Sequence, residues 1–283
     1  MRSFILRAAR FKTLMVLLGA VISLSTFLHD VGWVLLGGLV VMVAGFALMT
    51  VKPSRTGPEA FRGRPAGTTA AAGPRPVQAP VRGRWIAVNS PADKVPSHGV
   101  DAYGQTYAVD LVHHDEDDEW SAMRAWPPAR RAGAFSGFGK PIFAPADGEV
   151  VRASGWRRDH WSRNSWITLP FMMIEGMLRE LGGPGFILGN HVILDLGDGT
   201  YAAFAHLKRG SIKVRRGQRV RAGEHLADCG NSGNTSEPHL HFQLMDRPSP
   251  IVANGVPFVF DRYEAADGEE HRGVPAAGSA MRR

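Results

Sequence analysis

Two histidines stand two residues apart in the short apolar segment 237–242, which reads EPHLHF. Because successive side chains of a β-strand point to opposite faces, His239 and His241 would reach the same face of a sheet. Neutral imidazole nitrogens bind zinc at roughly 2.0–2.1 Å. A His-x-His pair by itself is more often two surface histidines. The segment therefore predicts a strand, and the rest of the sequence decides whether that strand carries a metal site.

The sequence before this segment consists of short strand-like runs separated by Gly, Asn and Asp. The runs include residues 190–195 (NHVILD), residues 201–207 (YAAFAHL) and a stretch over 214–226 in which Val, Gly and Leu recur. Short alternating runs broken by turn residues are typical of antiparallel hairpins. We therefore expect a mainly β domain built from antiparallel strands.

In this order the residues resemble the lysostaphin-type (LytM-type) zinc endopeptidases, which cut peptide bonds of bacterial peptidoglycan and share the duplicated hybrid motif fold. The shared segments are Gly-Asn-His at 189–191, Tyr-x-x-x-x-His-Leu at 201–207 and His-Leu-His-Phe at 239–242. The resemblance runs from about Trp85 to Leu244, and its last third is highly specific. It implies an antiparallel β-sheet metallopeptidase domain, Zn²⁺ as the cofactor and peptidoglycan peptides as the partners on which it acts.

The resemblance also implies a role for each matching residue. His241 corresponds to the third zinc ligand, and His239 to the histidine beside the metal that is not a ligand. His206 corresponds to the second catalytic histidine. His98, which follows a Pro-Ser pair, and Asp110, in the strand-like run 105–111, are the candidates for the first two zinc ligands.

The spacing of the first two ligands departs from the commonest family pattern, in which three residues separate the histidine from the aspartate. The interval from His98 to Asp101 is shorter than this, and the interval to Asp110 is longer. Related sequences that carry Tyr-Ala-(Ile/Val)-Asp-(Phe/Leu) after a distant histidine favour Asp110. Asp101, in the expected turn between Gly99 and Gly104, is the reserve candidate.

Two histidines and one carboxylate leave a tetrahedral zinc with an open position for water, which is the arrangement of a catalytic site. Zinc brings the pKa of such a water near 7. The chain has no His-Glu-x-x-His motif to supply a glutamate as general base. His206 and His239 are therefore the candidates for taking the proton and for stabilising the oxyanion, because imidazole titrates near pH 6.5.

Two other functional classes compete with the hydrolase. A non-catalytic cell-wall-binding or regulatory module on the same scaffold would be marked by loss of a ligand or catalytic histidine, yet this chain keeps a candidate at every position. A biotinyl- or lipoyl-like carrier shares the rhythm of residues 214–226, but it needs a modifiable lysine at a hairpin tip such as Met-Lys-Met, which is absent.

The first 52 residues differ from the rest of the chain. Basic residues precede apolar stretches at 13–28 and 31–51, which are interrupted by His29 and Asp30. About 20 apolar residues cross a bilayer, so we expect an N-terminal transmembrane helical hairpin that anchors the chain to the cell membrane. Basic residues on both outer sides favour cytoplasmic ends, whereas the expected substrate favours an extracytoplasmic catalytic domain; we adopt the extracytoplasmic orientation.

The sequence thus predicts a membrane anchor over 1–52, a flexible Pro/Gly/Arg-rich linker over 53–84, a zinc metallopeptidase domain over 85–264 and a disordered tail over 265–283. The linker and tail lack the apolar periodicity that a packed core requires. Within the domain, apolar residues at helical spacing over 171–181 predict a helix inside an insertion at 156–188. This helix is expected either to pack on the sheet or to line the substrate groove.

Several other residues have simpler interpretations. The polar run 113–118 (HHDEDD) is expected to be a solvated loop, His191 to pack or to line the cleft, Asp147 to stand in a turn, and the single Cys229 to be buried or a free thiol. The formal net charge of +7 comes without a nucleic-acid-binding motif, so no specific nucleic acid is expected as a partner. A basic surface suits anionic wall polymers or lipids.

Overall fold

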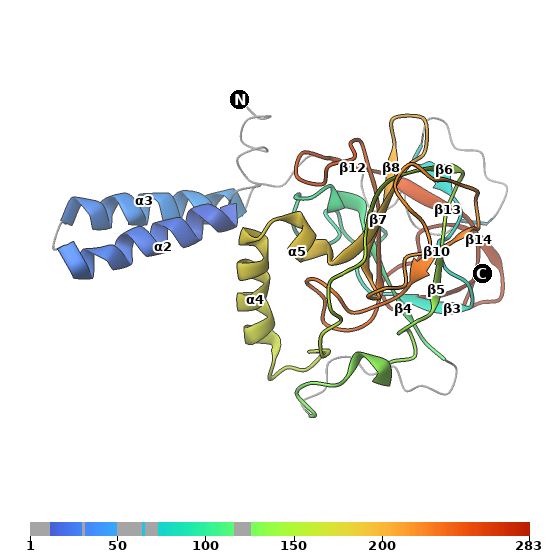
Figure 1. The fold of residues 1–283 in the computed structure, drawn as a ribbon, viewed down its shortest axis with the longest axis horizontal. Coiled ribbons are helices and arrows are strands. Elements are labelled where there is room, and N and C mark those ends of the chain that lie inside the picture. Colours follow the sequence, from blue (N-terminus) through green and yellow to red (C-terminus); the bar gives the residue numbers. More distant parts are fainter. Residues whose placement is uncertain (1–11, 30–31, 50–63, 66–72, 116–125) are drawn as a thin grey trace. The chain divides into compact units, whose positions relative to one another are not determined.

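The computed structural model describes residues 12–29, 32–49, 64–65, 73–115 and 126–283. They form two compact units, one made of two N-terminal helices and the other built around a large β-sheet (Figure 1). The elements in chain order are α2 (Lys12–His29), α3 (Gly32–Met49), β1 (Arg64–Pro65), β2 (Arg75–Val77), β3 (Arg84–Ala87), the 3₁₀ helix η3 (Gln105–Tyr107), β4 (Val109–His113), the 3₁₀ helix η4 (Ala132–Ala134), β5 (Pro141–Phe143), β6 (Gly148–Ser154), α4 (Leu169–Leu181), α5 (Pro184–Leu188), β7 (Asn190–Asp195), β8 (Tyr201–Leu207), β9 (Arg219–Val220), β10 (His225–Asp228), β11 (Leu240–Met245), β12 (Gly255–Val256), β13 (Phe258–Ala265), β14 (Glu270–Gly273) and β15 (Ala280–Arg282).

The helices α2 and α3 pack closely against each other at small residues. A Cβ atom placed on Gly19 would lie 2.5 Å from the carbonyl oxygen of Gly38, and one on Gly38 would lie 2.4 Å from Ser23 Oγ. Larger residues at either position would force the helices apart, because a close backbone approach leaves no room for a side chain. The prediction of two N-terminal helices joined near His29 and Asp30 agrees with this arrangement.

The membrane-spanning part of that prediction is not supported. Within the described residues, no helix combines the length and the apolar character needed to cross a bilayer.

The second unit confirms the prediction of a mainly β, antiparallel domain. Its large sheet runs β1-β14-β13-β15-β3-β4-β11-β8-β7-β6-β9, with β12 paired to β11 and β2 paired to β13. Every pairing is antiparallel except that of β2 with β13, and β10 pairs separately with β5. The central strands β4, β11, β8 and β7 come from distant parts of the sequence, so the sheet brings residues near 110, 241 and 206 together.

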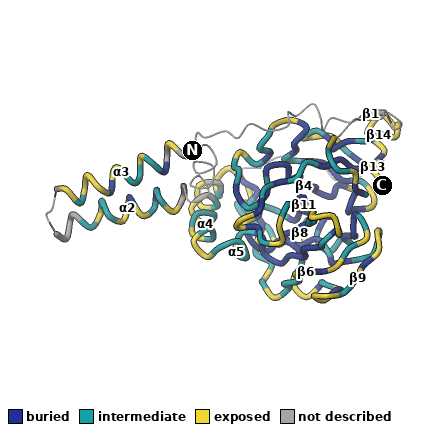
Figure 2. Tube along the Cα trace, turned by 90° about the horizontal axis from the view of Figure 1, so that it is seen from above, coloured by how far each residue is buried: buried dark blue, intermediate teal, exposed yellow. Residues whose placement is uncertain are grey.

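One face of the central strands forms the hydrophobic core. Phe204 lies directly opposite Phe242 in the register of β8 and β11, and their ring centroids are 5.4 Å apart. The ring of Phe242 also meets those of Phe258 and Phe260, and all four residues are fully buried. Figure 2 shows much of the trace through the central strands in the dark blue of buried residues. Because strand residues alternate between faces, this packing turns the intervening residues, including His241, to the opposite face.

The domain is larger at both ends than the predicted range of 85–264. The stretch 265–283, predicted to be a disordered tail, contains β14 and β15, and β15 pairs with both β3 and β13. The end of the predicted linker supplies β2, and Val77 and Val81 lie in the core. These predictions failed because each segment is too short and too rich in Pro, Gly and Arg to show periodicity, and gains its order by pairing with strands of the domain.

The insertion at 156–188 contains the predicted helix, as α4, and a second short helix, α5 (Figure 1). The apolar face of α4 is not packed on the sheet, since Phe171, Ile174, Leu178 and Leu181 are each more than half exposed.

The polar run 113–118, which was expected to be a solvated loop, is buried at its start. His113 ends β4 and His114 follows it, and both are buried, because the edge of the His113 ring packs on Trp85; the remainder of the run from Glu116 lies outside the described residues.

We predict that Met281→Ala lowers the free energy of unfolding of the sheet domain by about 2–5 kcal/mol. Met281 is 1% exposed in β15 and lies opposite Trp85 and Ala265, so truncation would leave a cavity. The exposed neighbour Ser279, changed to alanine, is the control and should alter stability by no more than about 0.5 kcal/mol. Calorimetric unfolding measures both, and equal effects would show that the end of the chain is not part of the core.

Candidate metal centre

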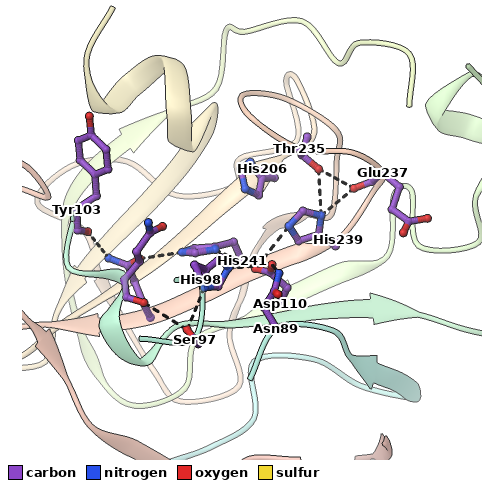
Figure 3. A network of polar contacts seen from close by, with 12 residues as sticks. Asn89, Ser97, His98, Tyr103, Asp110, His206, Thr235, Glu237, His239 and His241 are labelled. Carbon is purple, nitrogen blue, oxygen red and sulfur yellow. Dashed lines mark hydrogen bonds and ion pairs between the residues drawn. The ribbon is translucent and has the colours of Figure 1, made fainter. Parts of the chain in front are cut away.

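Three side chains that are distant in sequence converge on the polar face of the central strands. Asp110 Oδ2 lies 2.9 Å from His98 Nε2, and Asp110 Oδ1 lies 2.9 Å from His241 Nδ1 (Figure 3). One ligand atom from each residue lies within 4.8 Å of those of the other two. The structure therefore brings together the three residues that the sequence nominated as ligands, and among the described residues Asp101 is not part of this group.

Strand register explains why Asp110 and His241 meet. Asp110 in β4 is directly opposite His241 in β11, and directly opposed residues of an antiparallel pair project to the same face. His98 reaches them from the loop before η3. A shift of register by one residue would turn one member of the pair to the other face, so the strand pairing defines the centre.

Each of the three residues is oriented by an outer partner. Ser97 Oγ lies 2.9 Å from His98 Nδ1, Gln243 Oε1 lies 2.8 Å from His241 Nε2, and Asn89 Nδ2 donates to Asp110 Oδ2 at 2.8 Å. These contacts leave His98 Nε2 and His241 Nδ1 facing the carboxylate. Hydrogen bonds to the far atoms of metal ligands fix ring orientation and tautomer.

These outer partners were not identified from the sequence. Gln243 is fully buried, and its amide also donates to the carbonyl oxygen of Tyr103 at 2.7 Å. The alternation of His239, His241 and Gln243 along one strand face was a signal for Gln243. Ser97 and Asn89 carried no comparable signal, because they belong to irregular segments.

The donor set fits zinc. Two imidazole nitrogens and one carboxylate oxygen are a ligand combination found in catalytic zinc sites. Burial would raise the pKa of the Asp110 carboxyl, but the adjacent His98, His239 and His241 outweigh it and hold that pKa well below its usual range. Asp110 is therefore a carboxylate in the folded protein, which is the form that binds a metal.

His206 reaches the centre because β8 is irregular at its end. His241 is opposite Ala205, so regular alternation would send the next residue, His206, into the core. Instead His206 has a positive φ of 61°, and the register of β8 with β7 slips between Asn190 and Val192. A bulge of this kind redirects a side chain, and the His206 ring lies 5.7 Å from that of His241.

The rings of His206 and His239 lie near each other, and each donates from Nδ1 to a backbone carbonyl oxygen. His206 Nδ1 donates to the carbonyl oxygen of Ser232 at 2.9 Å, and His239 Nδ1 donates to that of Glu237 at 2.8 Å. Their ring centroids are 4.8 Å apart, and His239 Nε2 lies 3.6 Å from Asp110 Oδ1. In each ring the Nδ1 proton is committed to the backbone, which leaves Nε2 for chemistry.

Burial lowers the pKa of His206 well below its usual range, and the adjacent imidazoles of His239 and His241 lower it further. His206 is therefore neutral near pH 7 and presents an unprotonated Nε2.

His191, which was expected to pack or to line the cleft, is buried, and its Nδ1 donates to the carbonyl oxygen of Gly189 at 2.8 Å. Two of the simpler interpretations agree with the structure: Cys229 is buried, and Asp147 lies in the bend between β5 and β6, where its Oδ1 accepts from the backbone amide of Ala222.

Comparison with known families places this geometry in context. Residues 173–253 match the model described as peptidase family M23. This part of the chain belongs to peptidase family M23. The match contains His206, His239 and His241, whereas His98 and Asp110 precede it and join them through the sheet. The resemblance to lysostaphin-type endopeptidases is thus confirmed.

Curated relatives of this chain include three bacterial proteins. The cell division protein DipM of Caulobacter vibrioides is 31% identical over 118 residues, which cover 39% of this chain and 19% of DipM. The peptidoglycan DD-endopeptidase ShyA of Vibrio cholerae is 35% identical over 65 residues (23% and 15%), and the glycyl-glycine endopeptidase ALE-1 of Staphylococcus capitis is 31% identical over 112 residues (39% and 23%). The chain thus spans about a fifth of the length of these relatives.

Solved structures similar to this chain include the catalytic domain of lysostaphin from Staphylococcus simulans. That likeness covers 60% of this chain and 84% of the lysostaphin domain, with 20% identity and a TM-score of 0.32. Csd3 of Helicobacter pylori is 15% identical, with coverage of 65% and 34% and a TM-score of 0.32.

We predict that His98→Ala, Asp110→Ala and His241→Ala each abolish stoichiometric zinc binding, because each removes one of three converging donors. Asp101→Ala is the matched control and should retain zinc, as should His206→Ala and His239→Ala. Metal content after dialysis, measured by plasma mass spectrometry, distinguishes the two sets. Loss of zinc from Asp101→Ala with retention in Asp110→Ala would reverse the ligand assignment.

Proposed function

We propose that the chain is a zinc metalloendopeptidase that hydrolyses peptide bonds of bacterial peptidoglycan. The observation that carries the proposal is the convergence of His98, Asp110 and His241 beside two further histidines with free Nε2 atoms. Membership of the matched residues in family M23 supports the reaction class. The name of ShyA, a peptidoglycan DD-endopeptidase, supports peptidoglycan as the substrate class.

In this proposal His98 Nε2, Asp110 and His241 Nδ1 hold the metal. Zinc, when bound there, supplies a Lewis acid that polarises a carbonyl group and lowers the pKa of water. The protein groups then handle protons: His206, held neutral by burial and by its neighbours, accepts the proton of the attacking water at Nε2. The Nδ1 hydrogen bond to Ser232 keeps the ring in the tautomer that this step requires.

His239 takes the second role, in which its Nε2, when it carries a proton, donates to the developing negative charge on the scissile group. Its ring lies between His206 and Asp110, and Thr235 Oγ1 lies 3.0 Å from its Nδ1 in addition to the bond from Nδ1 to the Glu237 carbonyl. A side chain fixed in this way costs little reorganisation during the reaction. Figure 3 shows His239 and His206 approaching the centre from different elements.

We predict that the zinc-loaded full chain releases new amino termini from purified peptidoglycan, and that a chelator stops the release. His206→Ala should keep zinc but lower the rate by roughly 10²–10⁴-fold, the usual contribution of general acid–base catalysis. The control is His225→Ala, because His225 is partly exposed and pairs with Asp228 instead of the centre. Release that continues in chelator would contradict the proposal, and zinc binding without release would favour a cell-wall-binding module.

We further propose that α2 and α3 attach the protein to the cell membrane, with the catalytic domain on the extracytoplasmic side. Large apolar side chains on both helices are exposed, including Leu14, Leu18, Val21 and Leu24 of α2 and Trp33, Leu36, Val40 and Val43 of α3. Apolar surface of this extent is a mark of lipid or protein contact. This exposed apolar surface supports attachment of the two helices to lipid.

The attachment proposal predicts that the chain sediments with membranes and that deletion of residues 12–49 releases it. Alkaline phosphatase, which matures only outside the cytoplasm, should be active when fused after Arg283. If only a reporter that works in the cytoplasm is active when fused after Arg283, the catalytic domain lies on the cytoplasmic side and the proposed orientation is wrong.

A further inference from the structure

A cavity of about 440 Å³ lies between the insertion and the loop that follows β10. Its wall from the insertion includes Trp156, Arg157, Arg179 and Phe186, and Gly233 lies on the opposite wall. Gly233 directly follows Ser232, whose carbonyl oxygen holds His206. The cavity therefore adjoins the proposed catalytic histidine and is separate from the three candidate metal ligands.

The cavity carries an excess of positive charge. Its lining contains three arginines and one acidic residue, Glu175. Both carboxylate oxygens of Glu175 are already engaged, Oε1 by Arg179 at 2.8 Å and Oε2 by Arg163. Within the part of the chain that the structure describes, Arg157 forms no ion pair. Its guanidinium is therefore available to an anion from outside the protein.

Arg157 is also held in place. Its guanidinium stacks over the rings of Phe186 at 3.9 Å and Trp156 at 4.6 Å from the ring centroids. Burial and the nearby charge of Arg179 lower the pKa of Arg157, so a bound anion would relieve an existing electrostatic cost. A guanidinium packed between two rings loses little freedom when it binds.

The buried side chain of Asn190 fixes the position of Arg157 relative to His206. Asn190 Oδ1 accepts from the Arg157 backbone amide at 2.7 Å, and Asn190 Nδ2 donates to the carbonyl oxygens of Arg157 at 2.8 Å and Leu207 at 3.0 Å. The backbone amide of Asn190 donates to Ser232 Oγ at 2.9 Å. One residue thus joins the arginine to the strand end and the loop that flank the catalytic histidine.

We propose that this cavity is a substrate subsite in which Arg157 binds a carboxylate of an acidic peptide while the scissile bond lies at the metal centre. The planar guanidinium matches a carboxylate through two parallel hydrogen bonds, and Trp156 and Phe186 offer apolar contact to the neighbouring residue of the peptide. The inference rests on the proposed peptidase function, since it assigns the cavity to the same substrate. It names stem peptides with free carboxylates as the preferred ligands.

The test measures binding of a stem-type pentapeptide, acetyl-Ala-γ-D-Glu-acetyl-Lys-D-Ala-D-Ala, to the full chain by calorimetry with a chelator present, so that no turnover occurs. The same peptide with its carboxylates amidated is the neutral control. Amidation should raise Kd by about ten- to a hundredfold, the range for hydrogen bonds to charged groups. If amidation of the peptide leaves Kd unchanged, the subsite proposal is wrong. This comparison needs no variant of the protein.

Arg157→Gln should raise Kd for the acidic peptide to the same extent, and it should add nothing to the effect of amidation, because both changes remove one interaction. Arg157→Lys should restore part of the affinity by keeping the charge. Arg216→Gln, an exposed arginine outside the cavity, is the matched control and should leave Kd unchanged. Additive losses, or equal losses with Arg216→Gln, would contradict a specific carboxylate contact.

Three further outcomes separate the alternatives. If inorganic phosphate binds in an Arg157-dependent manner while peptide binding does not depend on Arg157, the cavity is a phosphate site and the peptide assignment is wrong. If binding depends on the carboxylate but the zinc-loaded chain releases no amino termini from peptidoglycan, the subsite stands and the peptidase proposal fails. If neither amidation nor Arg157→Gln changes the rate of hydrolysis, the peptidase proposal stands and the subsite proposal is wrong.

Discussion

The pairing of β11 between β4 and β8 is the constraint on which the candidate site depends. In this register Phe242 meets Phe204 on the core face, and His241 meets Asp110 on the opposite face. Burial of four phenylalanine rings on one face therefore fixes the position of the polar groups on the other. The hydrophobic effect stabilises this strand register. Because side chains alternate between the two faces of a strand, the same register places a carboxylate beside an imidazole on the polar face.

His206, a candidate catalytic histidine, requires a departure from that regularity. A perfect strand would bury His206 in the core, and the bulge with a positive φ returns it to the polar face. Backbone in this region is unfavourable for a residue other than glycine, and the surrounding contacts compensate for it. The Ser232 carbonyl holds the imidazole, and Asn190 ties the strand end to the loop that carries Ser232.

Asn190 also holds the insertion at 156–188. Its start is bonded to Asn190 through the Arg157 backbone, and His160 Nε2 lies 2.9 Å from the carbonyl oxygen of Gly233. Asn164 also donates to the half-buried carboxyl of Glu237 at 3.0 Å, shortly before β11. Although α4 exposes its apolar face, the base of the insertion is therefore bonded to the loops beside the candidate site.

The sequence by itself determined the elements with strong local signals: the alternating strands, the helix at 171–181, and the histidines whose spacing resembles a known family. It also nominated His98 and Asp110, and in the structure His98 Nε2 lies 2.9 Å from Asp110 Oδ2. Only the tertiary structure decided that Asp110 and not Asp101 joins His241, that a bulge redirects His206, and that Gln243 orients a ligand. It alone showed that residues beyond 264 complete the sheet and that Arg157 lacks an acidic partner among the described residues. These features depend on contacts between segments far apart in the chain, which local patterns of residues do not encode.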